Sequence, residues 1–199
     1  MNDLVKRRRK TTFKYTWPIY IVSAVIAIAG MNLAFKVAHP TPAYKVLTLF
    51  LTGELKNRKE LTSYIMQKYE DKQIKSFSCI EAKLNDGNYY HKLTVLGYNS
   101  ADVLIFPESK ITNLKVSDFA IELEEGLINS YCKDYHLYQQ DEVNYGIKLN
   151  KEKVADYMSL TNEDYYMVLN ARSANIGKYS TKQIKEHDMA LNVLTDWGM

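Results

Sequence analysis

The sequence predicts an α/β protein that an N-terminal helix holds in a membrane. Residues 15–35 form a stretch of 21 residues without a charged side chain. At about 1.5 Å per residue, a helix of this length spans the roughly 30 Å hydrocarbon core of a bilayer. Beyond it, short apolar runs typical of buried strands alternate with segments of helical periodicity. This alternation predicts a small three-layer α/β domain with a mostly parallel central sheet.

The first element is the apolar segment at residues 15–36, which we expect to cross the bilayer as one helix. Tyr15, Trp17 and Tyr20 lie at its start, where amphipathic rings favour the headgroup level. Pro18 is expected in the first turn, where its missing N–H removes a donor that has no helical partner.

Two alternatives to an uncleaved anchor stay open for this segment, a buried core helix and the apolar region of a cleaved signal peptide. Signal peptides carry a shorter apolar region of about 7–15 residues followed by a small-x-small cleavage site. Thr41-Pro42-Ala43 is a poor version of such a site. We therefore expect the helix to be retained.

The flanking charges predict the orientation. Residues 1–14 carry six Lys or Arg, whereas only Lys36 and Lys45 lie close behind the apolar segment. Positive charge stays cytoplasmic, so we expect a basic cytoplasmic tail at residues 1–14 and localisation in the plasma membrane with the C-terminal part outside. Residues 37–44, with Pro40 and Pro42, form a short stiff linker.

The charge balance argues against nucleic acid as a partner. The whole chain carries a net charge of +3, of which residues 1–14 contribute +5. The remainder is therefore close to neutral at −2, and it lacks the basic surface that binding to phosphate backbones requires. Beside an apolar helix, the basic run KRRRK is expected to set topology and to contact lipid headgroups.

The rest of the chain, residues 45–199, is expected to form one extracytoplasmic domain. Apolar runs predict strands at 45–51, 74–84, 101–106, 143–149 and 165–170. Helical spacing predicts helices at 54–70, 89–98, 114–123, 124–138 and 182–197. In the second of these, Tyr90, Leu93 and either Leu96 or Gly97 are expected to share the inner side.

Four of these segments together resemble one lobe of the type II extracellular solute-binding proteins of ABC importers. KVLTLFLTG at 45–53 matches the opening strand, and ADVLIFPES at 101–109 is similar to an "aDvfflp" strand. YGIKL at 145–149 and YMVLNA at 166–171 are similar to the "yGiPl" and "lyyNk" strands. About 30 residues follow Asn170, so we expect no full second lobe, and a spanning helix stands where the family has a lipid-attachment Cys.

Ligands of open α/β sheets bind outside the carboxyl ends of the strands. In this sequence the residues expected there, and hence the candidate ligand contacts, are Gly53, Glu54, Tyr89, Glu108, Ser109 and Arg172. The glycine would let a ligand approach the backbone, and the other five would supply polar or stacking contacts. Each of them can also be an ordinary solvated loop residue.

The sequence carries no enzyme motif, and we expect no catalytic residue, metal or cofactor. G-x-S-x-G, H-E-x-x-H and a phosphate-binding glycine loop are absent. Cys132 and His136 lie four residues apart on an expected helix, which is half of a metal site at most. Cys79 and Cys132 are expected to be free and apolar, with a Cys79–Cys132 disulfide as the alternative.

These observations favour a noncatalytic function at the membrane. We expect an accessory or binding subunit of an ABC transport system that contacts the bilayer through residues 15–36, a permease or other membrane protein, and a small ligand. The alternative is a sensory or regulatory ectodomain that acts through protein contacts. With 14 residues, the tail is too short to be a signalling domain.

Overall fold

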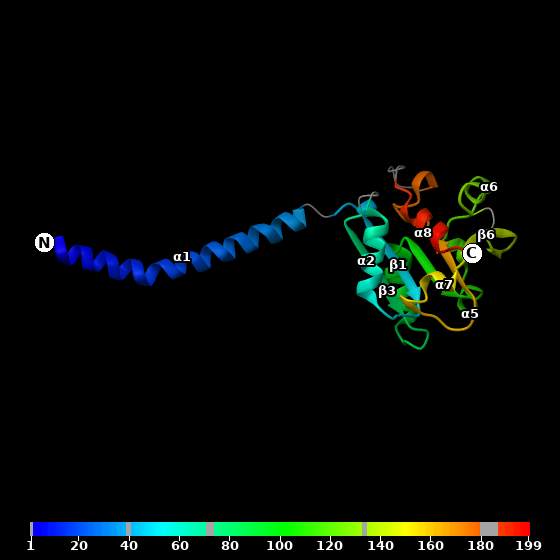
Figure 1. Ribbon diagram of the computed structural model, residues 1–199, viewed down its shortest axis with the longest axis horizontal. Helices are drawn as coiled ribbons and strands as arrows, with labels where there is room; N and C mark the ends of the chain where they lie inside the picture. The colour runs from blue at the N-terminus through cyan, green and yellow to red at the C-terminus, as the bar shows by residue number, and fades with distance from the viewer. Residues whose placement is uncertain (1, 39–40, 71–73, 133–134, 180–186) are drawn as a thin grey trace. The chain divides into compact units, whose positions relative to one another are not determined.

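The computed structural model describes residues 2–38, 41–70, 74–132, 135–179 and 187–199 (Figure 1). They belong to two compact units, Met1–Thr41 and Pro42–Met199. The first unit is helical and the second is an α/β domain, which confirms the predicted fold class at this level.

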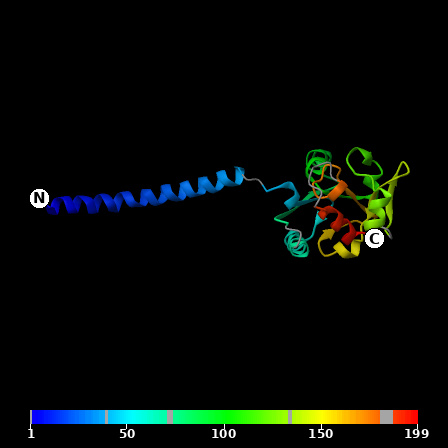
Figure 2. The ribbon, with the colours of Figure 1, turned by 90° about the horizontal axis from the view of Figure 1, so that it is seen from above.

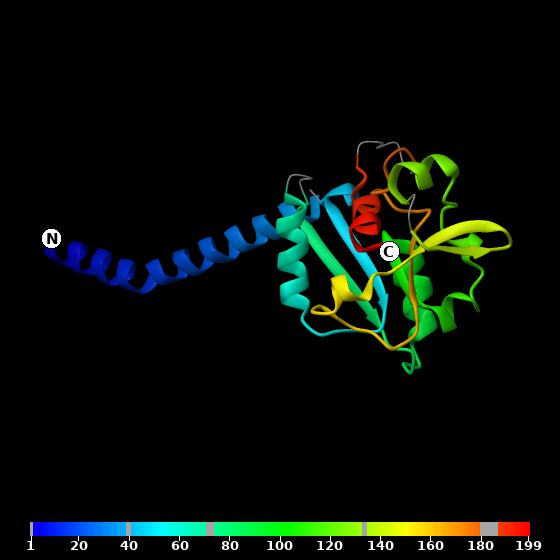
Figure 3. The ribbon, with the colours of Figure 1, turned by 45° about the vertical axis from the view of Figure 1, so that its right-hand side comes forward.

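The described part of the first unit contains one helix, α1 (Asn2–Ala38). Its segment Thr16–Phe35 has a mean hydropathy of 1.9 and none of it is buried. Length and composition therefore fit a membrane span, and the exposure argues against a buried core helix. The expectation for Pro18 was wrong, because α1 begins well before it and the proline lies inside the helix. A proline there removes one helical hydrogen bond and favours a bend, and Figures 1 and 3 show that α1 is bent.

The α/β domain is built on a six-stranded sheet. In spatial order its strands are β3 (Ser76–Ala82), β1 (Val46–Thr52), β4 (Val103–Pro107), β8 (Tyr165–Leu169), β6 (Val143–Lys148) and β5 (Leu137–Gln140). β1 pairs in parallel with β3 and β4, and the other three pairings are antiparallel. Four strands (β3, β1, β4 and β6) therefore run in one direction, so the sheet is mostly parallel, whereas β8 and β5 oppose them.

Helical segments complete the domain. They are η1 (Ala43–Lys45), α2 (Arg58–Lys68), α3 (Tyr89–Lys92), the π turn η3 (Leu93–Gly97), α4 (Tyr98–Ser100), α5 (Glu108–Ile111), η4 (Val116–Asp118), α6 (Glu125–Leu127), the π turn η5 (Ile128–Cys132), α7 (Lys151–Val154), η6 (Gly177–Tyr179) and α8 (Met189–Trp197). A separate two-stranded ribbon joins β2 (Glu54–Leu55) to β7 (Met158–Ser159).

The sheet separates two apolar clusters, which makes three layers. Leu49 and Leu51 of β1 belong to the cluster that also contains side chains of α2 and α8. Phe50, between them, belongs to the other cluster, together with Tyr89 and Leu93 of the 89–100 helical segment. Alternate side chains of a strand point to opposite faces, and Figure 2 shows α2 and the 89–100 segment on opposite sides of the sheet.

Two of the predicted helices form, but one begins at a different residue and the other has a partly different inner face. Helix α2 begins at Arg58, because the Asn57 side chain accepts from the Glu60 N–H and caps it. In the 89–100 segment the buried positions are Tyr89, Leu93 and Gly97, each four residues apart, which is the spacing of side chains on one face of a helix. The expectation that Tyr90 faces inward was therefore wrong, whereas Leu93 and Gly97, one of the two alternatives for the third position, are buried as predicted.

The two helices predicted at 114–123 and 124–138 were also wrong. Among the residues described between 114 and 138, the helical elements are the short turns η4, α6 and η5, and Leu137–Gln140 is an edge strand instead. Asp141 and Glu142 have φ angles of 52° and 65°, which suit the tight turn of a β-hairpin. Pairing with β6 therefore overrides the local helical preference. The predicted helix at 182–197 begins at Met189 in the described part, and residues 182–186 lie outside the described residues.

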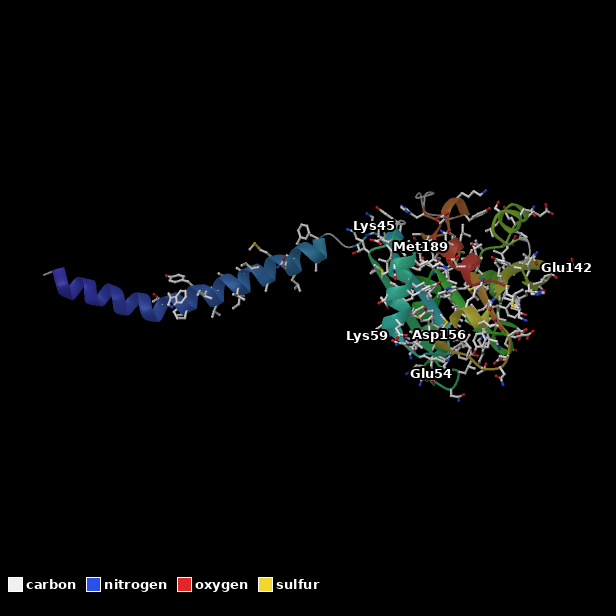
Figure 4. All side chains as sticks on the ribbon, in the orientation of Figure 1. Lys45, Glu54, Lys59, Glu142, Asp156 and Met189 are labelled. Atoms are coloured by element: carbon white, nitrogen blue, oxygen red, sulfur yellow. The ribbon has the colours of Figure 1, made fainter. Side chains whose placement is uncertain are left out.

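The parallel strands give the sheet two ends. We call the end where β1, β3 and β4 finish the carboxyl edge, and the end where they begin the amino edge. Lys45 and Glu54 flank β1, and Figure 4 shows them at opposite ends of the domain. Figure 3 shows β1 and β3 side by side next to α2.

Candidate functional site

Gly53 and Glu54 lie at the carboxyl edge, as the sequence predicts, and both have local structural partners. Gly53 adopts a φ of 155° at the turn between β1 and β2, a conformation that side-chain-bearing residues rarely adopt. Glu54 belongs to β2 and forms an ion pair with Lys83, 2.8 Å from carboxylate oxygen to ammonium nitrogen. The expectation that Glu54 lies in the first turn of a helix was wrong.

Tyr89 also lies near this edge, but its side chain is 2% exposed and belongs to the second core cluster. Its hydroxyl lies 3.1 Å from the Thr52 hydroxyl, and the Lys110 ammonium lies 5.4 Å from the centre of its ring. Burial raises the pKa of Tyr89, although the hydrogen bond with Thr52 acts in the opposite direction. The ring therefore supports the carboxyl edge from within.

Glu108 and Ser109 form the first turn of α5, and a neighbouring loop covers them. The Ser109 N–H donates to Glu163 Oε2 at 3.0 Å, and the Glu108 N–H donates to the Asp164 carbonyl at 2.8 Å. Hydrogen bonds from the Ser109 hydroxyl and N–H lower the pKa of Glu163. The loop thus occupies the position next to α5 that a ligand would need.

Arg172 lies at the opposite end of the domain from the other five predicted residues. It follows β8, which pairs antiparallel with β4, so the carboxyl end of β8 lies at the amino edge of the sheet. The structure therefore brings Gly53, Glu54, Tyr89, Glu108 and Ser109 to one edge and separates Arg172 from them.

A pocket of about 260 Å³ opens at the amino edge beside Arg172. Three segments that are far apart in the sequence form it: the start of the domain, the end of the 89–100 helical segment, and the turn after β8. Its lining residues, which we call the amino-edge pocket, are Ala43, Val46, Thr48, Asn99, Ser100, Ala101, Asp102, Arg172, Ser173 and Ala174.

Asp102 is the buried charge of this pocket, with 6% of its surface exposed. Its Oδ2 accepts from the Thr48 N–H at 2.8 Å, and its Oδ1 accepts from the Ser173 hydroxyl at 2.5 Å. Hydrogen bonds to an ionised carboxylate are among the stronger ones in proteins. They fix the carboxylate where β1, β4 and the turn after β8 meet.

Asn170 holds the same region together from the core side. It is 1% exposed, and its amide Nδ2 donates to the carbonyls of Gly97, Tyr98 and Ala101 at 3.2, 3.0 and 2.7 Å. Its Oδ1 accepts from the Arg172 N–H at 2.9 Å. Asn170 therefore joins the end of the 89–100 helical segment to the turn that carries Arg172.

The guanidinium of Arg172 is at the exposed side of the pocket. Its Nη1 donates to the Asn99 Oδ1. A guanidinium presents five N–H donors in a planar fork that matches a carboxylate. Arg172 can therefore bind an anionic group while it keeps its contact with Asn99.

Within the described residues, no group of three His, Cys, Asp or Glu side chains could hold a metal ion. Cys79 is free and buried, and burial raises the pKa of its thiol to about 12. A thiol with such a pKa is protonated at neutral pH and is a poor nucleophile. Cys79 is free, as the sequence predicts, so the alternative of a Cys79–Cys132 disulfide was wrong. The side chain of Cys132 lies outside the described residues, and the expectation that it is free stays a prediction.

Comparisons with protein-family models, with curated proteins and with solved structures give no match for this chain. The resemblance to solute-binding proteins therefore rests on the four sequence segments alone.

Sequence reasoning missed most of the amino-edge pocket. Asp102 is the one charged residue within the run ADVLIF, and a carboxylate directly before a fully buried strand is a detectable signal. Thr48, Ser100 and Ser173 carry no such signal, because hydroxyl residues are common at strand ends and turns.

Proposed function

We propose that this chain is a noncatalytic accessory or binding subunit of an ABC transport system, anchored in the plasma membrane by residues 15–36 with its α/β domain outside. The strand order β3-β1-β4 supports a domain of the doubly wound class. Domains of this class bind ligands at the ends of their strands, and the fold by itself does not imply a particular reaction. The basic residues 1–14 support the orientation.

The observation that carries the proposal is an exposed apolar surface on the 89–100 helical segment. Outside α1, the exposed large apolar side chains of the described residues are Tyr90, Val95, Leu96 and Met199. Three of these four lie within seven consecutive residues of that segment. Clustered exposed apolar residues mark surfaces that contact other proteins. For a domain anchored in a membrane, the nearest candidate partners are other membrane proteins.

The proposal is tested by purifying the full-length protein from its native membrane in mild detergent and identifying its partners by mass spectrometry. We expect a stoichiometric permease and ATPase with the wild type. Val95→Asp and Leu96→Asp should lose both, because a charge in an apolar contact is not compensated. Met199→Asp, a matched change at an exposed apolar residue elsewhere, should keep them.

Two outcomes would contradict the proposal. Recovery of the protein without a permease and ATPase would contradict its assignment to an ABC transport system. Recovery with a signalling protein in place of the permease would favour the sensory ectodomain.

A further inference from the structure

The amino-edge pocket combines one buried anion with one accessible cation. Asp102 lies at its base, 6% exposed and held by Thr48 and Ser173. Arg172 lies on its exposed side and donates to Asn99. A purely anionic ligand would meet the charge of Asp102, and a purely cationic one the charge of Arg172. Only a ligand that carries both charges is attracted at both ends.

Uncharged hydrogen-bonding groups complete the polar part of the pocket. The hydroxyls of Thr48 and Ser100 line it, and among the described residues neither hydroxyl has a protein partner. Each hydroxyl can donate one hydrogen bond and accept two. They can therefore serve an ammonium as acceptors or a carboxylate as donors between the two charged residues.

Size and wall chemistry limit the ligand further. About 260 Å³ is below the 300–1,000 Å³ typical of pockets for drug-sized molecules. The remaining walls are small and apolar, since they consist of Ala43, Val46, Ala101 and Ala174. The pocket therefore has room for a small molecule with a short apolar side chain.

We propose that the amino-edge pocket binds a small zwitterion with a primary ammonium and a carboxylate, such as a free amino acid with a short side chain. The ammonium faces Asp102, and the carboxylate binds the guanidinium fork of Arg172. The site lies at the edge opposite to the one where the sequence predicts a ligand. It does not depend on the proposed transporter partner, because none of its lining residues belongs to the exposed apolar surface at Tyr90, Val95 and Leu96.

The test compares three probes of matched size by isothermal titration calorimetry on the full-length protein in mild detergent. L-alanine carries both charges, ethylamine lacks the carboxylate, and propionate lacks the ammonium. We expect L-alanine to bind and each of the other two to bind at least about tenfold more weakly, because each loses one charge-assisted contact.

Variants then assign the binding to this pocket. Arg172→Gln should weaken L-alanine about tenfold or more and leave ethylamine unchanged, whereas the control Arg58→Gln at the carboxyl edge should alter neither. Ser100→Trp, a change at an exposed residue of the pocket, should abolish binding by filling the space.

Three results would overturn the proposal. The first is no heat of binding from L-alanine at millimolar concentration. The second is propionate binding as tightly as L-alanine, which would indicate a plain anion site. The third is unchanged L-alanine affinity in both Arg172→Gln and Ser100→Trp, which would place the ligand elsewhere on the protein.

Discussion

Both edges of the sheet carry polar side chains, but the two edges use them differently. At the carboxyl edge the polar groups bind one another, as Ser109 with Glu163 and Glu54 with Lys83 show. At the amino edge, Asp102 and Arg172 border a pocket that stays open between them. A polar residue at a strand end therefore indicates a site only where its neighbours leave space for a ligand.

The comparison also predicts where the domain is sensitive to substitution. At the amino edge, Asp102, Asn170 and Ser173 are buried and join separate segments, so their removal leaves unsatisfied partners. Polar groups at the carboxyl edge are mostly exposed, and water replaces a lost partner at little cost. Four substitutions, from the largest expected effect to the smallest, test this difference.

The largest effect is expected from Asn170→Ala at the amino edge. The substitution removes an amide that serves three carbonyls and the Arg172 N–H inside a buried site. We expect a loss of about 3 kcal/mol in the free energy of unfolding, measured by urea unfolding of the full-length protein in detergent. Asn162→Ala, at an exposed asparagine, is the control and should change little. A loss below about 1 kcal/mol for Asn170→Ala would contradict the conclusion that the amino edge is the more sensitive of the two edges.

Tyr89→Phe should have an intermediate effect, because Tyr89 lies near the carboxyl edge but is buried. The change leaves the Thr52 hydroxyl, which is 0% exposed, without its tyrosine partner. About 1 kcal/mol of stability should be lost. The control is Tyr90→Phe at the exposed neighbouring ring. Equal unfolding midpoints for the two variants would show that burial does not decide the effect.

Glu163→Gln should cost no more than about 1 kcal/mol at neutral pH, because the carboxylate caps a short helix near the surface. The pKa of Glu163 is lowered in the folded state by its bonds with Ser109. Its contribution is therefore complete above the ordinary glutamate pKa of about 4.3 and is lost as the pH falls through the lower folded value.

Unfolding curves of the wild type and Glu163→Gln, recorded between about pH 7 and pH 3, should converge towards the acid end. The control Glu70→Gln changes an exposed glutamate and should not reproduce this convergence. A gap between wild type and Glu163→Gln that stays constant over the range would contradict the assigned role of the carboxylate.

The smallest effect is expected from Glu54→Gln. The Glu54 and Lys83 side chains are about half exposed or more, and exposed ion pairs of this kind add little stability and are screened by salt. The unfolding midpoint should equal that of the wild type at both low and high salt. A salt-sensitive decrease would show that the carboxyl edge depends on this pair.

Much of the fold could be predicted from the sequence, because apolar runs such as 45–51 and 101–106 report burial directly. They became β1 and β4 within one or two residues. The direction of β8 could not be predicted in this way. An apolar run has the same pattern in either direction, and the direction is set by the connection through α7 and β7. For this reason Arg172 was grouped with the wrong edge.

The candidate site was predictable to a smaller extent. Arg172 was identified, but Asp102 was missed because its role depends on the Thr48 N–H and on Ser173, 71 residues away. Such a constellation forms only when distant segments meet in the folded state. In the 89–100 segment Leu93 and Gly97 were predicted on the inner side, and Tyr90 was exchanged for its neighbour Tyr89, because two adjacent tyrosines carry the same local signal.

The place of β1 in the sheet has a mechanical consequence. The linker leads directly into β1, and β1 lies between β3 and β4 rather than at a sheet margin. A pull that arrives through residues 42–45 enters the sheet at the first residue of β1, where the hydrogen bonds of two ladders resist it. An edge strand would have only one ladder to resist the same force. The domain is thus tethered through one of its most firmly held strands, and tension on the tether would reach Val46 and Thr48 of the pocket wall before the rest of the sheet.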